Sequence, residues 1–121
     1  ILKNIKDNLE IKLRIQIGEF AQFGPGKVYL MEAIEKTGSI SAAAKKIGMS
    51  YRKAWKLIND LNRISKSKMV VTSIGGRGSG GAKLTNTGKE FIDLFRKMEV
   101  KALIAIKNEK IELEKILNDL K

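Results

Sequence analysis

The sequence predicts a mainly α-helical fold with a small β component. Three patterns support this prediction: an alternating stretch near the N-terminus, two short helical segments joined by a glycine-containing turn, and a glycine-rich segment between two short strand-like runs. A chain of 121 residues has room for one hydrophobic core and one appended element. We therefore expect a single functional module.

The N-terminal part of the chain has the pattern of a half-buried strand. Between Leu9 and Ile17 every second residue is apolar, and the residues between them are polar or charged. A period of two places successive side chains on opposite faces of a strand. Gly24, Pro25 and Gly26 interrupt the pattern, so we expect one strand before the first helix.

Three helical segments follow, each delimited by residues typical of helix ends. The first is expected over residues 27–36, and Gly38 follows it as a C-terminal stop. The second, short and rich in alanine, lies within residues 39–48, and Ser50 can cap a third helix that continues to about residue 65. Two short helices joined by such a turn form a helix-turn-helix.

A β-hairpin is expected after the third helix. Residues 69–74 and 82–84 have strand character on either side of a glycine-rich tip. The glycines of this tip also match G-x-G-x-x-G, but a dinucleotide site needs a helix directly after them, whereas a strand is expected here. We interpret the tip as flexible backbone able to approach phosphates, with Arg77 and Lys83 as its cations.

The C-terminal part predicts one long helix. Thr85 or Thr87 can cap it, and neither glycine nor proline follows Gly88. A helix over residues 86–120 would be roughly 50 Å long at 1.5 Å per residue. Apolar residues at three-four spacing favour a dimeric coiled coil, and the alternative is a packing face within one chain. The expected dimer contacts are Leu103, Ile106, Leu113, Leu117 and Leu120.

The charge balance indicates a polyanionic partner. The chain has 24 Lys and Arg residues and 13 Asp and Glu residues, which gives a net charge of +11. No apolar run is long enough to span a membrane and no leader is recognised, so we expect a cytoplasmic protein without a membrane partner. Because the chain has no Cys and no His and its carboxylates are scattered, we expect no catalytic residues, no enzyme activity, no metal site and no cofactor.

The third helix carries cations opposite its apolar side. On a helical wheel Ala54 and Ile58 face the core, while Arg52, Lys56, Asn59 and Arg63 share the other face. Such a face is usually solvated, but the second helix of a helix-turn-helix enters the DNA major groove. The candidate DNA contacts are Ser41, Ser50, Tyr51, Arg52, Lys53, Lys56, Asn59, Arg77 and Lys83.

Aromatic residues lie beside these cations. Tyr51 and Trp55 are one turn apart, so their rings are expected to stack. Trp55 is interpreted either as a core residue or as a brace that holds Tyr51 against DNA. Arg52 is the best candidate for a bidentate contact to guanine, a contact worth about 1–3 kcal/mol of discrimination.

Two motifs together resemble a known family. The first motif, residues 38–44 and 48–55, is similar to the N-terminal domain of the ModE-type molybdate-responsive regulators. These regulators are relatives of the LysR-type winged helices. The second motif, from Gly75 to Thr85, resembles the wing of that domain. The resemblance implies a homodimeric transcription regulator. Full-length members carry C-terminal oxyanion-binding domains, and this sequence ends after the last helix, so an oxyanion effector is not expected from this chain.

We therefore expect a winged helix-turn-helix with an N-terminal strand over residues 1–85 and a C-terminal dimerisation helix over residues 86–121. Its expected function is sequence-specific binding of double-stranded DNA as a homodimer, with half-sites about 34–36 Å apart. The family resemblance suggests molybdate or related metal-oxyanion genes as targets. The alternatives are a nonspecific nucleoid-type or RNA-binding protein and a winged-helix module that binds another protein.

Overall fold

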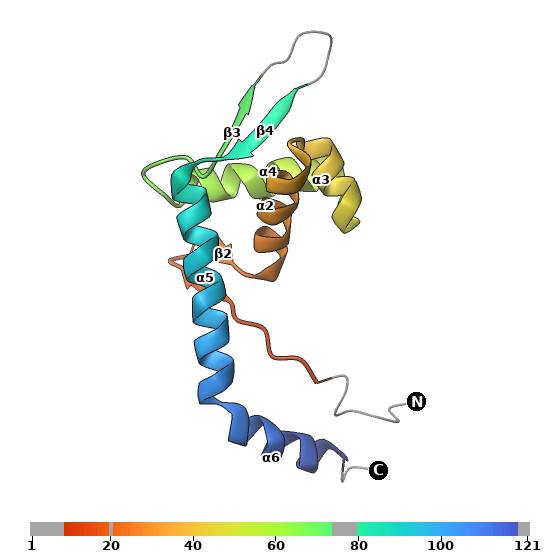
Figure 1. Ribbon diagram of the computed structural model, residues 1–121, viewed down its shortest axis with the longest axis vertical. Helices are drawn as coiled ribbons and strands as arrows, with labels where there is room; N and C mark the ends of the chain where they lie inside the picture. Colours follow the sequence, from red (N-terminus) through yellow and green to blue (C-terminus); the bar gives the residue numbers. More distant parts are fainter. Residues whose placement is uncertain (1–8, 20, 74–79, 119–121) are drawn as a thin grey trace.

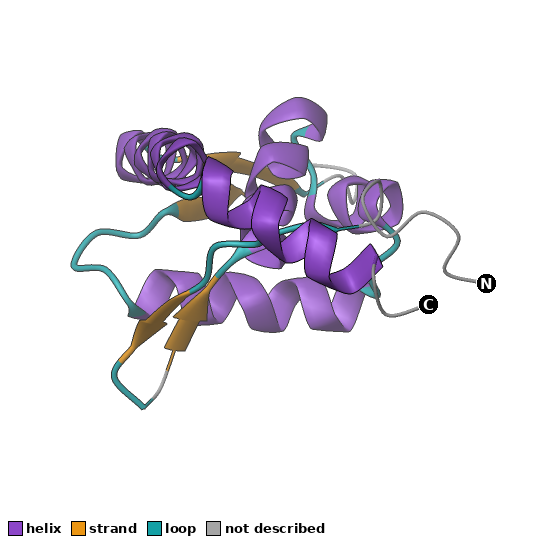
Figure 2. Ribbon diagram, turned by 90° about the horizontal axis from the view of Figure 1, so that it is seen from below, coloured by secondary structure: helices purple, strands orange, loops and turns teal. Residues whose placement is uncertain are grey.

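The computed structural model describes residues 9–19, 21–73 and 80–118. Helices α2, α3 and α4 gather beside one end of α5, and the hairpin of β3 and β4 projects beyond them (Figure 1). A perpendicular view shows the same projection of the hairpin strands from the helices (Figure 2). The predicted, mainly helical winged fold is confirmed. The elements are β1 (Ile15–Ile17), β2 (Ala21–Phe23), α2 (Pro25–Thr37), α3 (Ile40–Ile47), α4 (Tyr51–Arg63), β3 (Val70–Ser73), β4 (Gly81–Leu84), α5 (Asn86–Ala105) and α6 (Lys107–Asn118).

The N-terminal strand is shorter than predicted and has a partner that the sequence pattern did not indicate. β1 pairs antiparallel with β2, with Ile15 opposite Phe23 and Ile17 opposite Ala21. Residues 9–14 alternate between half-buried and exposed, but they lie outside the strand. The prediction of one strand over Leu9–Ile17 was therefore wrong in its extent. Alternation of apolar and polar residues indicates which side of an extended segment is buried, but it does not indicate whether another strand pairs with that segment.

The helix-turn-helix has the predicted ends. Ser39 Oγ accepts a hydrogen bond from the N–H of Ala42 at 3.2 Å, and Ser50 Oγ accepts one from the N–H of Lys53 at 3.1 Å. Gly48 ends α3 with a φ of 72°, a left-handed conformation that glycine adopts without strain. These caps hold α3 and α4 in the arrangement that the sequence predicts.

The core joins the helix-turn-helix to β2 and α5. Leu30 of α2 and Leu61 of α4 are fully buried. Phe23 of β2 packs edge-to-face on Phe91 and Phe95 of α5, with ring centroids 4.1 and 5.0 Å apart. The short strand β2 thus connects the N-terminal hairpin to the long helix.

The first turn of α5 packs tightly against the chain before β3. Thr85, one of the two predicted caps, accepts a hydrogen bond at Oγ1 from the N–H of Gly88 at 3.1 Å, and the same hydroxyl donates to the carbonyl of Lys68 at 2.7 Å. A Cβ atom on Gly88 would lie 2.3 Å from the carbonyl oxygen of Met69. Only glycine therefore fits at this contact.

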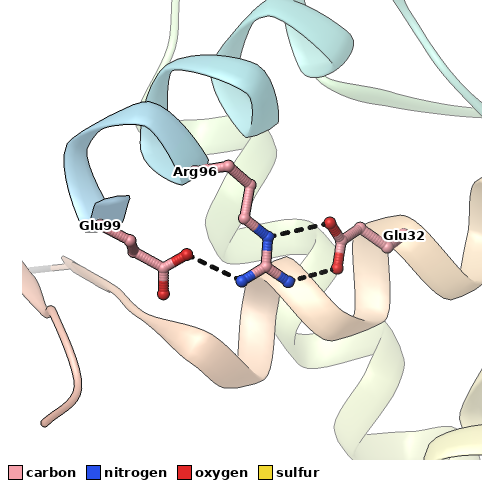
Figure 3. A network of polar contacts seen from close by, with 3 residues as sticks. All are labelled: Glu32, Arg96 and Glu99. Atoms are coloured by element: carbon pink, nitrogen blue, oxygen red, sulfur yellow. Dashed lines mark hydrogen bonds and ion pairs between the residues drawn. The ribbon is translucent and has the colours of Figure 1, made fainter. Parts of the chain in front are cut away.

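An arginine on α5 connects this helix to α2. Arg96 donates from Nε and Nη2 to the two carboxylate oxygens of Glu32, at 3.0 and 2.5 Å, and from Nη1 to Glu99 at 2.8 Å (Figure 3). The hydrogen bond with Glu32 is the largest cause that raises the pKa of Arg96. The bidentate geometry orients α5 against α2.

The predicted single C-terminal helix is two helices in the structure. Ile106 has φ −103° and ψ 13° and separates α5 from α6. Its N–H still donates to the carbonyl of Ala102 at 3.1 Å, but the chain changes direction there (Figure 1). The prediction of a continuous helix over residues 86–120 was therefore wrong. It relied on the absence of glycine and proline, and Ile106 is neither.

Candidate nucleic-acid interface

Helix α4 separates apolar and cationic side chains as the helical wheel predicts. Ala54 and Ile58 are buried in the core. Arg52, Lys56 and Asn59 are exposed on the opposite side. We call these three residues the α4 stripe. The stripe presents two cations and one amide, which are side chains that can donate hydrogen bonds to phosphates and to base edges.

The α4 stripe borders a shallow, basic depression that extends beyond the end of the helix. Arg63 and Lys68 line its far part together with Asp60. Arg63 donates from Nη2 to Asp60 Oδ1 at 2.6 Å, so its charge is partly compensated. Arg52 and Lys56 have no such carboxylate partner among the described residues.

The two aromatic residues beside the stripe contact one another, but their rings do not stack as predicted. The rings of Tyr51 and Trp55 meet edge-to-face, with centroids 6.2 Å apart and planes 82° apart. Trp55 is half-buried and packs on the core, whereas 54% of Tyr51 is exposed. The packing of Trp55 on the core agrees with the first interpretation. Its ring contact with Tyr51 is the geometry that the second interpretation requires, and a role in holding Tyr51 against DNA stays a prediction.

The remaining candidates on the helices lie at different edges of this surface. Ser41 is exposed on α3. Ser50 precedes α4, and its Oγ serves as a helix cap, so its hydroxyl proton is still available to a ligand. Lys53 lies outside the α4 stripe, since it lines a separate groove with Arg14 and Lys27.

The wing is fixed to the helix-turn-helix by contacts that the sequence analysis missed. Asn62 Oδ1 accepts hydrogen bonds from the N–H groups of Met69 and Val70 at 2.9 and 3.1 Å, and Asn62 Nδ2 donates to the carbonyl of Val70 at 3.0 Å. The N–H of Ala82 donates to the carbonyl of Gly38 at 2.9 Å. Both strands of the wing are thus anchored, β3 by α4 and β4 by the residue that ends α2.

Of the two predicted cations of the wing, the structure describes Lys83 but not Arg77. Lys83 is exposed on β4, opposite Val71 of β3. Arg77 lies outside the described residues. The alternation of β4, with Ala82 and Leu84 buried on either side of Lys83, places the lysine on the solvent face of the hairpin.

The predicted dimer residues are exposed in part, and the break at Ile106 divides them between two helices. Leu103 of α5 and Leu113 of α6 are 42% and 41% exposed, and Ile106 and Leu117 are half-buried. Leu120 lies outside the described residues. Further exposed apolar side chains accompany them on the same two helices: Leu94, Met98, Val100, Ile104, Ile111 and Ile116.

Other kinds of site have little support in the part of the chain that the structure describes. Within residues 9–19, 21–73 and 80–118, no group of three His, Cys, Asp or Glu side chains is arranged to hold a metal ion. None of the helices in those ranges is both long and apolar enough to cross a membrane.

Comparisons with known proteins agree with this arrangement. Residues 26–89 match the family described as "Bacterial regulatory helix-turn-helix protein, lysR family". The transcriptional regulator ModE of Yersinia pestis is 37% identical over 111 residues, which cover 89% of this chain and 42% of that protein. The DNA-binding transcriptional dual regulator ModE of Escherichia coli K12 is 38% identical over 86 residues, 71% of this chain and 33% of that protein.

A third relative has a name that refers to molybdenum. The molybdenum transport protein ModE of Azotobacter vinelandii is 39% identical over 74 residues, 61% of this chain and 27% of that protein. The chain thus spans less than half the length of these curated relatives. The matches confirm the resemblance to the N-terminal part of ModE-type regulators. With both helices of the helix-turn-helix and the wing inside residues 26–89, this chain belongs to the lysR family of bacterial regulatory helix-turn-helix proteins.

Proposed function

We propose that this chain is a transcription regulator that binds double-stranded DNA in a sequence-specific manner. The observation that carries the proposal is the α4 stripe: Arg52, Lys56 and Asn59 are exposed along the second helix of a helix-turn-helix whose wing is fixed beside it. A helix fits the major groove, where base edges are distinguishable. The wing would then lie along the flanking duplex.

The proposed contacts fall into two groups. Arg52 and Lys56, near the start of α4, would reach base edges, with Arg52 donating to guanine. Cations and hydroxyls at the edges of the surface would contact phosphates, which set position without reading sequence. This second group consists of Ser41, Ser50, Lys53, Lys83 and Arg77.

A homodimer completes the proposal. The exposed apolar side chains of α5 and α6, including Leu103 and Leu113, would be covered by a second copy, so residues 86–121 would serve dimerisation and residues 1–85 DNA binding. Two copies would present two α4 helices to a pseudo-palindromic operator. The relatives' names suggest genes of molybdate or related metal-oxyanion metabolism as targets, with the protein acting in the cytoplasm.

The alternatives make different predictions in a competition experiment. A labelled duplex carrying a bound sequence is competed with the same unlabelled duplex, with random duplex and with folded RNA. Specific binding predicts displacement by its own sequence at much lower concentration than by the other two competitors. Equal displacement by all three would favour a nonspecific nucleoid-type or RNA-binding protein.

Charge reversal tests the interface itself. The double variant Arg52→Glu and Lys56→Glu should lower duplex affinity by about 100-fold or more. The matched control is Lys107→Glu and Lys115→Glu, which reverses two exposed charges on α6 and should have a much smaller effect. Unchanged affinity in the first variant would favour a protein-interaction module instead.

A further inference from the structure

A second basic groove lies along α4, beside the α4 stripe but lined by other residues. Its cations come from three parts of the chain: Arg14 from the segment before β1, Lys27 from the first turn of α2 and Lys53 from the first turn of α4. The groove has a volume of about 260 Å³, and none of its lining residues is acidic. Cations that converge from separate elements into a concave surface attract an anionic group.

The groove holds its cations with neutral partners. Arg14 Nη1 donates to Gln22 Oε1 at 2.9 Å, and Lys27 Nζ donates to the main-chain carbonyl of Gln22. The side chain of Arg14 lies over Gly24, where a Cβ atom would be 3.6 Å from Arg14 Cγ and Nε. Because an amide and a carbonyl carry no net charge, these contacts position the cations without neutralising them.

Lys27 is also influenced by charged groups outside the groove. Burial is the largest influence on the pKa of Lys27 and lowers it; Asp60 acts in the opposite direction, and Lys56 lowers the pKa further. Asp60 also has another partner, because its Oδ1 accepts a hydrogen bond from Arg63 at 2.6 Å. Lys27 is therefore close enough to the α4 stripe to be affected by the charge of Lys56. An incoming anion would favour the charged form of Lys27 and so oppose both effects.

The groove and the wing lie on different sides of α4. Asn62 faces β3 and binds Val70, whereas Lys53 and Leu57 line the groove. On the helical wheel the stripe residue Lys56 falls between these two sides. A duplex seated on the α4 stripe would therefore pass close to the wing on one side and to Arg14, Lys27 and Lys53 on the other.

We propose that this groove binds a phosphate of the DNA backbone beside the major groove that α4 occupies, so that Arg14 and Lys27 extend the DNA contact beyond the helix-turn-helix and wing. The inference rests on the proposed function. A phosphate contact adds affinity that falls with salt and carries no sequence information. The groove should therefore strengthen binding to every duplex equally.

The test compares two double variants of the full chain. In Arg14→Gln with Lys27→Gln, duplex affinity should fall about tenfold for a selected sequence and for random duplex alike, and the slope of log affinity against log salt should decrease by about one to two. The control, Lys107→Gln with Lys115→Gln, removes two exposed charges from α6 and should leave the slope nearly unchanged. Phosphate ethylation interference should show a contact that the groove variant alone loses.

Further variants separate loss of charge from loss of fold and identify the source of the anion. Arg14→Lys with Lys27→Arg should restore the salt slope, because both charges remain. If the groove variant equals the control while Arg52→Glu with Lys56→Glu abolishes binding, the groove proposal is wrong and the proposed function stands. If neither variant affects duplex binding, the proposed function fails. Tight binding of inorganic phosphate at constant ionic strength, lost in the groove variant, would overturn backbone phosphate as the ligand in favour of a free anion.

Discussion

Two asparagines three residues apart on α4 have different environments. Asn62 makes three hydrogen bonds to the main chain of Met69 and Val70, whereas Asn59 is exposed beside Arg52 and Lys56. The hydrophobic pattern does not distinguish them, because both are polar residues on the same helix. Only the position of β3 shows that one asparagine is structural and the other is available to a ligand.

This difference predicts opposite effects of the same substitution. Asn62→Ala leaves main-chain groups at the base of the wing without partners and should lower the free energy of unfolding by about 2–3 kcal/mol. Asn59→Ala should change it by less than about 0.5 kcal/mol and weaken duplex binding. Urea unfolding and duplex titration measure the two quantities. Equal destabilisation by both substitutions would contradict the assignment.

Glycines allow a second residue-level prediction. A Cβ on Gly88 would overlap the carbonyl oxygen of Met69, whereas nothing lies within 4 Å of a Cβ on Gly26. Gly88→Ala should therefore destabilise the fold by about 1–3 kcal/mol, because the first turn of α5 must move. Gly26→Ala, also in a first helical turn, should leave stability unchanged or raise it by up to about 1 kcal/mol. Thermal unfolding of both variants checks this; a stable Gly88→Ala would show that the contact is not tight.

At the scale of elements, helices with caps were predictable and elements without local signals were not. Ser39, Gly48 and Ser50 define the ends of α3 and α4 within a residue or two, because each provides a local hydrogen bond or backbone conformation. β2 has only three residues and gives no periodic signal. The break at Ile106 has no glycine or proline to mark it, so the local sequence favours a continuous helix.

The cap of α4 gives a prediction about an element. Ser50→Ala removes the acceptor for the N–H of Lys53 and should lower the free energy of unfolding by about 1 kcal/mol. Ser50→Asp keeps an acceptor and should retain stability, while its negative charge near the proposed phosphates should weaken duplex binding. Measuring stability and binding for both variants separates the cap from the interface. A fully stable Ser50→Ala would argue against the cap.

The sequence predicts the surface that a single helix forms, the α4 stripe, but it does not predict the groove, which needs residues from distant segments. The α4 stripe follows from a period of 3.6 residues within a known helix. Arg14 and Lys27 meet Lys53 only because the segment before β1, α2 and α4 converge. The sequence gives no sign of this contact, because the three residues are far apart in the chain and no regular spacing relates them.

For the whole molecule, the exposed apolar residues of α5 and α6 predict self-association. Leu103→Asp with Leu113→Asp places charges in the proposed dimer contact and should convert a dimer to a monomer in sedimentation equilibrium. Lys101→Asp with Lys115→Asp alters one exposed polar position on each of the same helices and should leave the dimer intact. A wild-type chain that sediments as a monomer at all concentrations would contradict this prediction.

Selection of bound duplexes from a random pool tests the central claim most directly, because specificity, symmetry and spacing are read from one experiment. If Arg52 and Lys56 read base edges from two copies of α4, the selected sequences will share a pseudo-palindrome whose half-sites lie about one helical turn apart, and Arg52→Ala will relax the preference at one position in each half-site. Selected duplexes with no common sequence, bound no better than the starting pool, would contradict the account.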